Sequence, residues 1–399
     1  MNTLLKHWKE AATVVLAAGT RKHTLSESVS KAHSADPLAL PLLPNIQRDA
    51  TAWARPEVAA FDYAVLLLQR SGNSKFMPNA HVFPGGQIDP SDFSSDWIEV
   101  FWPFGQPPDF NLGTVQQTTG RSPIYATDRK KLGSPVPGEI GFRICAIRET
   151  FEESGVLLVR SNYEHPGGQG IPQLPEYEWK ELEVWRARVQ KNPVNFLAMC
   201  RELSCIPDIW ALKEWNNWLT PTGLGQSRRY DTAFFICCVQ EIPFTTQDKK
   251  ETVLYNWLTP HEALERFTPD GIWLPPPQYY ELSRLCHFPS LQGLHEFSRE
   301  RELEGCECWL PVRLAASDGF IQLLPGDELY PNDPHWMGEK NLNLSSTKSV
   351  EELCRDATRL HRIKYRSLYD FTLQVNIEPK YKHIHPLIKS NPRNMSSKL

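Results

Sequence analysis

The fold is decided by one stretch, residues 148–156, which reads Arg148-Glu149-Thr150-Phe151-Glu152-Glu153-Ser154-Gly155-Val156. Each residue advances about 100° around an α-helix, so the three glutamates share one face. Ile144, Ile147 and Phe151 fall on the opposite face, which predicts that this other side is buried. Gly155 is a typical C-terminal cap. The stretch therefore predicts a helix that ends at Gly155 and carries three carboxylates on one side.

The acidic face is unfavourable as plain structure. Glu149 and Glu153 form a like-charge pair one turn apart, which costs about 0.2–0.5 kcal/mol. The acids also crowd the C-terminal end of the helix, where the dipole is negative. Arg148 is spaced to pair with Glu152, which relieves one charge, and a hard divalent cation with oxygen ligands fits the rest. The alternative is an ordinary acidic helix face exposed to solvent.

The stretch resembles the Nudix hydrolase signature, whose second half is R-E-U-x-E-E-x-G-U with U aliphatic. The match runs from Arg148 to Val156, with Thr150 as a mild departure. The opening of the signature is matched by Phe83-Pro84-Gly85-Gly86-Gln87-Ile88-Asp89, and six residues after Gly86 comes Asp92, where the family has Glu. The segment 93–138 is a long insertion between the two halves. Whether Asp89 and Asp92 reach the metal stays open.

Around this signature the chain resembles the coenzyme A diphosphatase branch of the family, in its peroxisomal members with a split signature. The resemblance rests on segments 66–71, 76–86, 228–232, 257–260 and 274–277. It implies metal-dependent hydrolysis of the pyrophosphate bond of coenzyme A and fatty acyl-coenzyme A, giving 3′,5′-ADP and (acyl-)4′-phosphopantetheine. Two alternatives remain: hydrolysis of other nucleoside diphosphate derivatives or capped RNA ends, and an inactive Nudix-like binding scaffold.

The resemblance implies catalytic roles for four residues of the stretch. Glu149 and Glu153 are the first candidates for holding Mg²⁺ or Mn²⁺, with Glu152 as a further ligand or as the general base. Arg148 would orient these carboxylates. A covalent route through a cysteine is disfavoured, because no cysteine lies beside a histidine with an orienting acid.

Five further residues are candidates for substrate binding. The turn at Gly85 and Gly86 lets the backbone approach a ligand closely, and exposed N–H groups can hold phosphate oxygens. Arg70, Arg228 and Arg229 are candidates for the 3′-phosphate of a coenzyme A-type substrate. Each of the three arginines has an alternative role in a surface salt bridge.

The predicted fold class is α+β or α/β, specifically a Nudix fold with a mixed sheet between helices. We expect a Nudix domain over 1–330 and a C-terminal extension over 331–399. Within the domain, residues 22–60 are rich in Ser, Ala and Pro and predict a surface insertion. Residues 93–138 form the insertion that splits the signature.

Apolar patterning predicts the main elements. Strands are expected over 11–18, 61–69 and 232–239, where apolar residues run almost without interruption. Short helices are expected over 209–218 and 350–363. The strands over 61–69 and 232–239 should lie inside the sheet, because each is an almost continuous apolar run.

The split-signature insertion is rich in aromatic residues. It contains Trp97, Phe101, Trp102, Phe104 and Phe110. The favoured interpretation is that they pack the insertion onto the domain. The alternative is that they form the wall of an acyl or adenine pocket.

Composition excludes several classes of protein. The chain has 399 residues, 41% of them hydrophobic, and a net charge of −4, which gives no basic footprint for nucleic acid. No apolar run is long enough to predict a membrane span. The nine cysteines include the pair Cys306 and Cys308, but no second pair is spaced to complete a zinc site.

The last three residues, Ser397-Lys398-Leu399, form a peroxisomal import address. They predict a peroxisomal location and an import receptor as a partner. The other expected partner is a small-molecule substrate, coenzyme A or its acyl esters.

Overall fold

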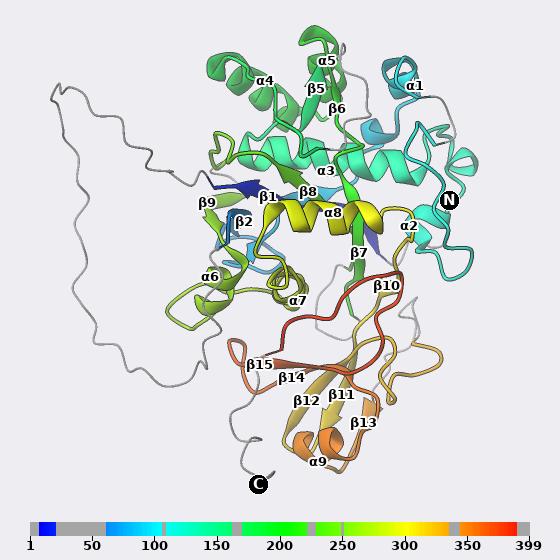
Figure 1. The fold of residues 1–399 in the computed structure, drawn as a ribbon, viewed down its shortest axis with the longest axis vertical. Helices are drawn as coiled ribbons and strands as arrows, with labels where there is room; N and C mark the ends of the chain where they lie inside the picture. The colour runs from blue at the N-terminus through cyan, green and yellow to red at the C-terminus, as the bar shows by residue number, and fades with distance from the viewer. Residues whose placement is uncertain are drawn as a thin grey trace, which may run out of the picture.

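The computed structural model describes residues 8–20, 61–105, 109–161, 170–221, 229–248, 251–334 and 344–388. The predicted insertion 22–60, Arg228 and the tripeptide Ser397–Leu399 lie outside these ranges. Within them the chain forms an eight-stranded sheet, a five-stranded sheet and a two-stranded ribbon (Figure 1).

The eight-stranded sheet is mixed. Its order is β10-β7-β8-β1-β2-β3, with β4 beside β1 and β9 beside β2. Its strands are β1 (Lys9–Gly19), β2 (Tyr63–Arg70), β3 (His81–Val82), β4 (Gly85–Gln87), β7 (Lys213–Leu219), β8 (Tyr230–Val239), β9 (Thr252–Leu258) and β10 (Cys308–Trp309). β1 pairs in parallel with β8 and antiparallel with β2. The strands predicted over 11–18, 61–69 and 232–239 are confirmed as β1, β2 and β8.

Both faces of this sheet are covered, which explains the uninterrupted apolar runs. In β1, Val14 and Leu16 belong to one hydrophobic core, and Val15 and Ala17 belong to another. Alternate side chains of a strand point to opposite faces, so one strand supplies both cores.

Helices from different parts of the chain cover the two faces. They are α3 (Gly138–Ser154), α4 (Trp179–Lys191), α5 (Asn195–Glu202), α6 (Pro260–Glu265), α7 (Pro276–Leu285) and α8 (Leu291–Glu300). Apolar residues of α3, α4 and α5 lie in the core on one face, and those of α7 and α8 lie in the core on the other. The ribbon of β5 (Val159–Ser161) and β6 (Cys205–Pro207) lies with the α3 layer. None of the described helices has the length and apolarity to cross a membrane.

The 3₁₀ turn η2 (Pro90–Phe93) leads into the insertion 93–138, which forms three short helices: α1 (Asp96–Phe101), α2 (Pro123–Ala126) and the 3₁₀ turn η3 (Arg129–Leu132). Trp97, Phe101, Phe104 and Phe110 are buried in the α3-side core, whereas Trp102 is 54% exposed. The interpretation that these aromatic residues pack the insertion onto the domain is confirmed for the four buried rings.

The five-stranded sheet has the order β13-β11-β12-β14-β15. Its elements are β11 (Val312–Ala316), β12 (Gly319–Leu323), β13 (Leu344–Ser345), α9 (Val350–Arg355), β14 (His361–Tyr365) and β15 (Phe371–Val375). One face packs against α9. On the other face, Ile363, Phe371 and Leu373 belong to the same hydrophobic core as the apolar residues of α7 and α8. The predicted division at residue 330 lies between β12 and β13 of this one sheet.

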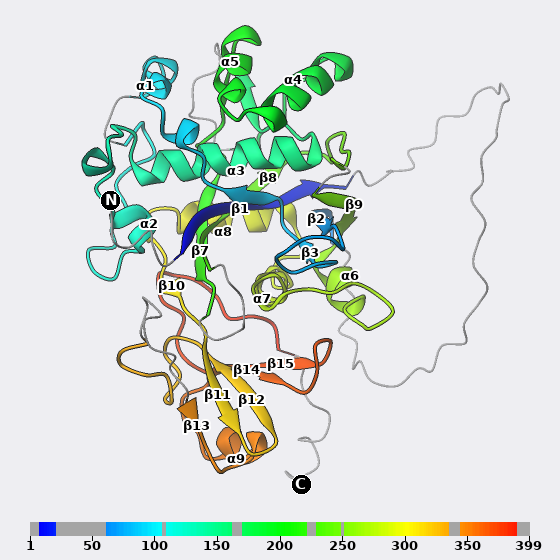
Figure 2. The same ribbon diagram turned by 180° about the vertical axis from the view of Figure 1, so that it is seen from behind.

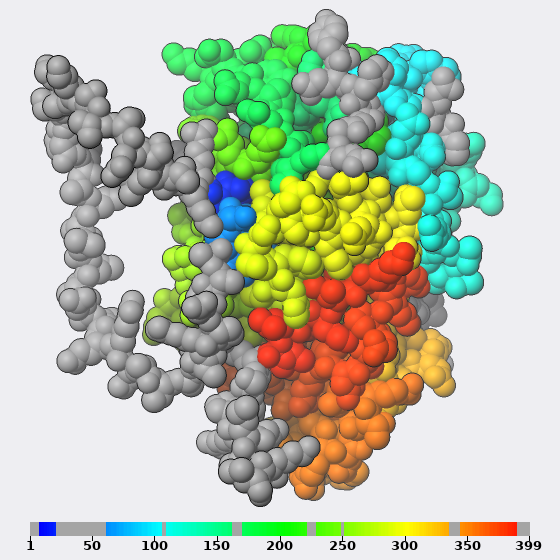
Figure 3. Space-filling model, in the orientation of Figure 1, coloured from blue at the N-terminus to red at the C-terminus, as the bar shows by residue number. Residues whose placement is uncertain are grey.

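Two views place the five-stranded sheet on the side of the larger sheet that faces away from α3 (Figures 1 and 2). The segment after β15 then returns along α7. Arg284 Nε donates to the carbonyl of Ile384 at 3.0 Å, and the Leu387 N–H donates to the carbonyl of Ser283 at 2.9 Å. In the space-filling view this segment, in red, lies directly against the region of α8, in yellow (Figure 3).

The helix predicted over 209–218 is wrong, because Lys213–Leu219 is strand β7. A register shift between Glu214 and Asn216 marks a bulge in its pairing with β8. The extra residue at a bulge lets Trp215 and Trp218, three positions apart, face the same core, which imitates helical spacing.

The helix predicted over 350–363 is too long. α9 ends at Arg355, and His361–Tyr365 is strand β14. β14 pairs with both β12 and β15, so its backbone groups are satisfied across the sheet instead of along a helix.

Candidate active site

The acidic end of α3 is buried and does not face open solvent. α3 ends at Ser154, and Gly155 caps it with a φ of 73°, as predicted. The exposed fractions of the Glu149 and Glu152 side chains are 18% and 14%, and Glu153 is 4% exposed. Because ionised carboxylates avoid burial unless they have partners, the interpretation as a solvated acidic face is wrong.

Arg148 lies at the centre of these acids and is 2% exposed. Its Nε and Nη2 donate to both oxygens of Asp92, at 2.8 and 2.9 Å. Its Nη1 donates to Glu149 Oε1 at 2.9 Å and to Glu152 Oε1 at 2.6 Å. One guanidinium therefore faces three carboxylates, and negative charge remains in excess.

Asp92 and Asp89 have structural roles in the first half of the signature. Asp92 is 1% exposed, and besides pairing with Arg148 it accepts the Asp89 N–H at 2.9 Å. The Asp89 carboxylate accepts the Ser91 N–H at 2.9 Å, which caps the 3₁₀ turn η2. Asp92 thus holds Arg148 from the far side of the insertion. Neither aspartate lines the large cavity described below.

The glycine turn and the acids meet directly. The Gly85 N–H donates to Glu153 Oε2 at 2.9 Å. Gly85 has a φ of 152°, and an added Cβ would lie 2.3 Å from the carbonyl oxygen of Ala12 on the neighbouring strand. A Cβ on Gly86 would lie 2.4 Å from the Glu149 carboxyl carbon. Gly85 needs glycine, because the backbone of strand β1 leaves no room for a side chain. At Gly86 an added side chain would displace the Glu149 carboxylate.

The pKa values of the three glutamates are raised, because burial disfavours their ionised forms. Burial, and then the neighbouring Glu152 charge, raise the pKa of Glu149 to about 7, although Arg148 opposes the shift. Burial and the Glu149 charge raise the pKa of Glu153 well above its usual value. Burial also raises the pKa of Glu152. A cation near these groups would favour their ionised forms.

The donor set fits a divalent cation in chemistry and charge. The residues are hard carboxylate oxygens on one helical turn, which Mg²⁺ and Mn²⁺ prefer. Across the described part of the chain, no three His, Cys, Asp or Glu side chains already converge as a ligand group. The reason at α3 is that Glu149 and Glu152 turn toward Arg148, while Glu153 turns toward Gly85. Rotation of these side chains is needed to bring three of them around one ion.

A cavity of about 720 Å³ opens beside the glycine turn. Gly85, Gly86 and Glu149 line it, whereas Glu152 and Glu153 do not. Its size is that of a pocket for a cofactor-sized ligand. Of the three glutamates, Glu149 is therefore the one whose side chain reaches the cavity.

The arginines predicted to bind the substrate differ in whether they line the cavity. Arg70 lines the cavity, and its guanidinium donates to the Phe76 carbonyl at 3.0 Å and to Ser74 Oγ at 2.9 Å. Arg229 does not line it; its Nε donates to the Thr220 carbonyl at 2.9 Å. Arg228 lies outside the described residues.

Two charged residues at the cavity were missed from the sequence. Lys75 lines the cavity in the loop after Arg70. Glu251 also lines it and is close enough for its charge to raise the pKa values of Glu152 and Glu153. No motif or spacing marks Glu251 in the sequence, because it lies about a hundred residues beyond the signature in a polar loop. Lys75 lies between two of the segments that carry the family resemblance, 66–71 and 76–86.

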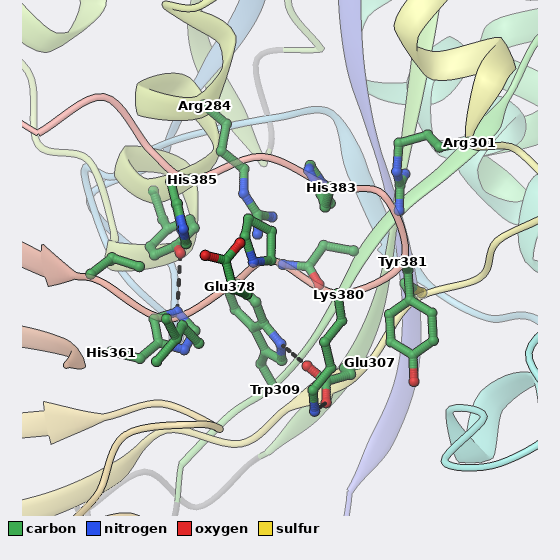
Figure 4. A pocket seen from close by; sticks show the side chains of 16 residues that line it. Arg284, Arg301, Glu307, Trp309, His361, Glu378, Lys380, Tyr381, His383 and His385 are labelled. Atoms are coloured by element: carbon green, nitrogen blue, oxygen red, sulfur yellow. Dashed lines mark hydrogen bonds and ion pairs between the residues drawn. The ribbon is translucent and has the colours of Figure 1, made fainter. Parts of the chain in front are cut away.

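None of the aromatic residues named in the insertion lines this cavity, so the interpretation that they wall an acyl or adenine pocket is wrong for this cavity. A second cavity, of about 40 Å³, lies where the segment after β15 crosses α7 and β10 (Figure 4). Arg284, His361 and His383 are among its lining residues. It has room for a few water molecules at most, which excludes a nucleotide.

Comparison with known proteins divides the chain in two. A family model described as the NUDT19 Nudix domain matches residues 8–285, and one described as the NUDT19 C-terminal domain matches residues 313–376. Three curated relatives are all named acyl-coenzyme A diphosphatase NUDT19.

The relative from Xenopus laevis is 49% identical over 403 residues, which cover 99% of this chain and 100% of that protein. The one from Gallus gallus is 47% identical over 410 residues, with 100% of both chains covered. The one from Homo sapiens is 45% identical over 350 residues, which cover 84% of this chain and 92% of that protein. The similarity therefore extends through both sheets that border the large cavity.

Proposed function

Because this chain belongs to the Nudix hydrolase family, in the group defined by the NUDT19 Nudix and C-terminal domains, we propose that it hydrolyses the pyrophosphate bond of coenzyme A and its acyl esters. The products would be 3′,5′-ADP and (acyl-)4′-phosphopantetheine. The Nudix fold and the assignment as an enzyme follow from the family. The names of three relatives at 45–49% identity support the substrate class.

One observation carries the proposal: the turn at Gly85 and Gly86 meets the acidic end of α3 at the wall of a ligand-sized cavity. A pyrophosphate is a poor electrophile because its oxygens are negatively charged. A site for its hydrolysis must therefore hold a diphosphate beside groups that bind a cation. This wall of the cavity combines the two, since its glycine backbone lies against Glu149 and Glu153.

Nudix hydrolases generally use a divalent metal, and we propose Mg²⁺ or Mn²⁺ here. Glu149 and Glu153 are the first ligands, with Glu152 as a third. When bound, the ion polarises phosphate oxygens and lowers the pKa of a coordinated water. Arg148 holds the carboxylates of Glu149 and Glu152 in place, and Asp92 fixes Arg148 in turn.

Glu149 is the carboxylate we propose to face the substrate. It lines the cavity, whereas Glu152, the residue first expected as general base, is held by Arg148 away from the lining. Arg70 and Lys75 line the cavity as well and supply positive charge for the phosphates. Both would balance the anionic substrate without direct involvement in bond cleavage.

The test is turnover by the purified full chain. The protein with Mg²⁺ or Mn²⁺ and acyl-coenzyme A should release 3′,5′-ADP and acyl-phosphopantetheine, measured by liquid chromatography. Glu149→Gln should lower the rate of release about 1,000-fold. A matched control is Glu139→Gln on the same helix, whose side chain pairs with Arg121 and does not line the cavity. It should retain the wild-type rate.

A different outcome would redirect the assignment. No turnover of any coenzyme A ester, together with hydrolysis of another nucleoside diphosphate derivative or a capped RNA end, would support the alternative that the chain is a Nudix hydrolase with that other substrate. No turnover of any diphosphate would support a binding scaffold instead.

We also propose that Ser397-Lys398-Leu399 directs the protein to peroxisomes through an import receptor. The tripeptide is the observation that supports this location. A fluorescent protein fused to the N-terminus should label peroxisomes in cells, and deletion of the tripeptide should leave the label diffuse. An unchanged distribution after the deletion would reject the proposal.

A further inference from the structure

The large cavity extends from the acids to the five-stranded sheet. Three aromatic residues of that sheet line it: Phe320, Tyr365 and Phe371. They come from three neighbouring strands, and the pairing register sets Phe320 opposite Tyr365 and Tyr365 opposite Phe371. Residues opposite one another in adjacent strands share a face, so the three rings form one row across the sheet.

The row is held together by ring contacts. The rings of Phe320 and Tyr365 stack with centroids 4.6 Å apart, and those of Tyr365 and Phe371 are 5.3 Å apart. The Tyr365 hydroxyl donates to Gln322 Oε1 at 2.8 Å, and Gln322 also lines the cavity. Leu368, which is 55% exposed, continues the lining beyond the rings. This wall is apolar, and its one buried hydroxyl is satisfied.

Charge divides the cavity lining into two parts. The charged lining residues are Arg70, Lys75, Glu149 and Glu251. Arg70, Glu149 and Glu251 lie together: the Ser71 N–H donates to the Glu251 carbonyl at 2.8 Å, and the charges of all three residues act on Glu153. Lys75 lies in the loop that follows Arg70. The remaining lining, which includes everything contributed by the five-stranded sheet, is uncharged.

The substrate of the proposed reaction divides in the same way. On one side of its pyrophosphate is adenosine with a charged 3′-phosphate, and on the other is an uncharged pantetheine arm that ends in the acyl group. With the pyrophosphate at Gly86 and Glu149, the 3′-phosphate matches the end with Arg70 and Lys75. The uncharged arm matches the part of the cavity that leads to the aromatic row.

We propose that Phe320, Tyr365 and Phe371 hold the acyl group of the substrate, so that the C-terminal domain sets acyl-chain preference. This inference rests on the proposed function and names a binding site within it. Each buried methylene of an acyl chain adds to affinity, so an apolar wall at this end favours longer esters. The Nudix domain then cleaves the bond while the C-terminal domain selects the ester.

The test compares substrates that differ only in the acyl group. kcat/KM is measured for coenzyme A, acetyl-, octanoyl- and palmitoyl-coenzyme A with the full chain. In Phe320→Ala, kcat/KM for coenzyme A should stay within about twofold of the wild-type value. For octanoyl- and palmitoyl-coenzyme A, kcat/KM should fall about tenfold. Leu368→Ala alters an exposed residue with little risk to folding, and should give a smaller loss in the same order.

Thr372→Ala is the matched control. Thr372 follows Phe371 in β15, is exposed, and points to the face of the sheet opposite Phe371. It should keep the wild-type chain-length profile.

Three results would overturn the inference. If both variants hydrolyse all four substrates in wild-type proportions, the inference fails and the proposed function stands. A loss that is equal for coenzyme A and its esters, with weaker inhibition by 3′,5′-ADP, would mean that the rings hold adenine. If the wild-type chain hydrolyses none of the four, the proposed function fails and the inference fails with it.

Discussion

The molecule contains two buried arginine–aspartate pairs of nearly the same geometry, one in each domain. Arg148 donates to both oxygens of Asp92 at 2.8 and 2.9 Å, and Arg362 donates to both oxygens of Asp327 at 2.7 and 2.6 Å. Both arginines are 2% exposed or less. The difference lies in the third donor nitrogen.

In the C-terminal domain, Arg362 Nη1 donates to the neutral carbonyl of Leu353 at 2.9 Å, so the pair is balanced. In the Nudix domain, Arg148 Nη1 donates to Glu149 and Glu152, so one positive charge faces three negative ones. Burial of an ion pair is therefore no sign of a site by itself. Uncompensated charge beside a cavity is the sign, because it remains costly until a ligand neutralises it.

The largest expected effect is on kcat, which should fall when the Arg148 site is altered but not when the Arg362 pair is altered. Glu149→Gln should lower kcat about 1,000-fold, equivalent to about 4 kcal/mol, because a cation ligand at the cavity is lost. Asp327→Asn should leave the kcat of the folded protein within a few-fold. The measurement is steady-state hydrolysis of acyl-coenzyme A at saturating Mg²⁺. Equal losses in both variants would contradict the distinction.

The second prediction concerns stability. Asp327→Ala leaves Arg362 buried without its carboxylate, and should lower the free energy of unfolding by about 3 kcal/mol. Urea denaturation followed by circular dichroism measures this change. The double variant Asp327→Leu with Arg362→Leu removes both charges and should recover much of the loss. A single variant as stable as the wild type would show that the pair is not structural.

The third prediction uses pH to test the uncompensated charge. The folded-state pKa of Glu149 is raised to about 7, so the folded protein binds more protons than the unfolded chain between pH 4.5 and 7. Without metal, the contribution of this group to stability should therefore fall as pH rises through that window. Glu149→Gln should be about 3 kcal/mol more stable than the wild type at pH 8, and equally stable near pH 4.

The comparison is made by urea denaturation in a chelating buffer at both pH values. If Glu149→Gln is less stable than the wild type at pH 8, the charge of Glu149 is already balanced in the folded protein. The excess of charge at Arg148 would then not mark a site.

The smallest expected effect is stabilisation by the ion itself. At ten times its dissociation constant, Mn²⁺ or Mg²⁺ should stabilise the folded protein by about 1.4 kcal/mol. The shift in melting temperature should disappear in Glu149→Gln combined with Glu153→Gln, and should persist in Asp327→Ala. A shift that survives the double substitution would place the ion elsewhere.

Local pattern was enough to predict much of the site. The spacing of Glu149, Glu152 and Glu153, with Gly155 after them, predicted the helix and its acidic turn. The family signature joined this turn to Gly85 and Gly86 across the insertion, and their contact is observed. Chemistry that depends on neighbours along one helix, or on a motif, can be read from the sequence.

Residues that meet only through distant contacts were not predicted. The sequence left open whether Asp92 reaches the metal. In the structure its carboxylate binds Arg148. Glu251 reaches the cavity through the pairing of β9 with β2. β7 was expected as a helix, because a bulge gave its tryptophans helical spacing.

The sequence by itself determined the helix, its acids and the glycine turn, because each is fixed by interactions within a few residues or by a family signature. Only the tertiary structure decided which glutamate reaches the cavity and which aromatic residues form its far wall. The rings of Phe320, Tyr365 and Phe371 become one surface through strand pairing. That surface shares a cavity with Glu149, and the two sheets that border the cavity share a hydrophobic core. Such contacts depend on how separate elements pack, and a linear pattern does not encode them one by one.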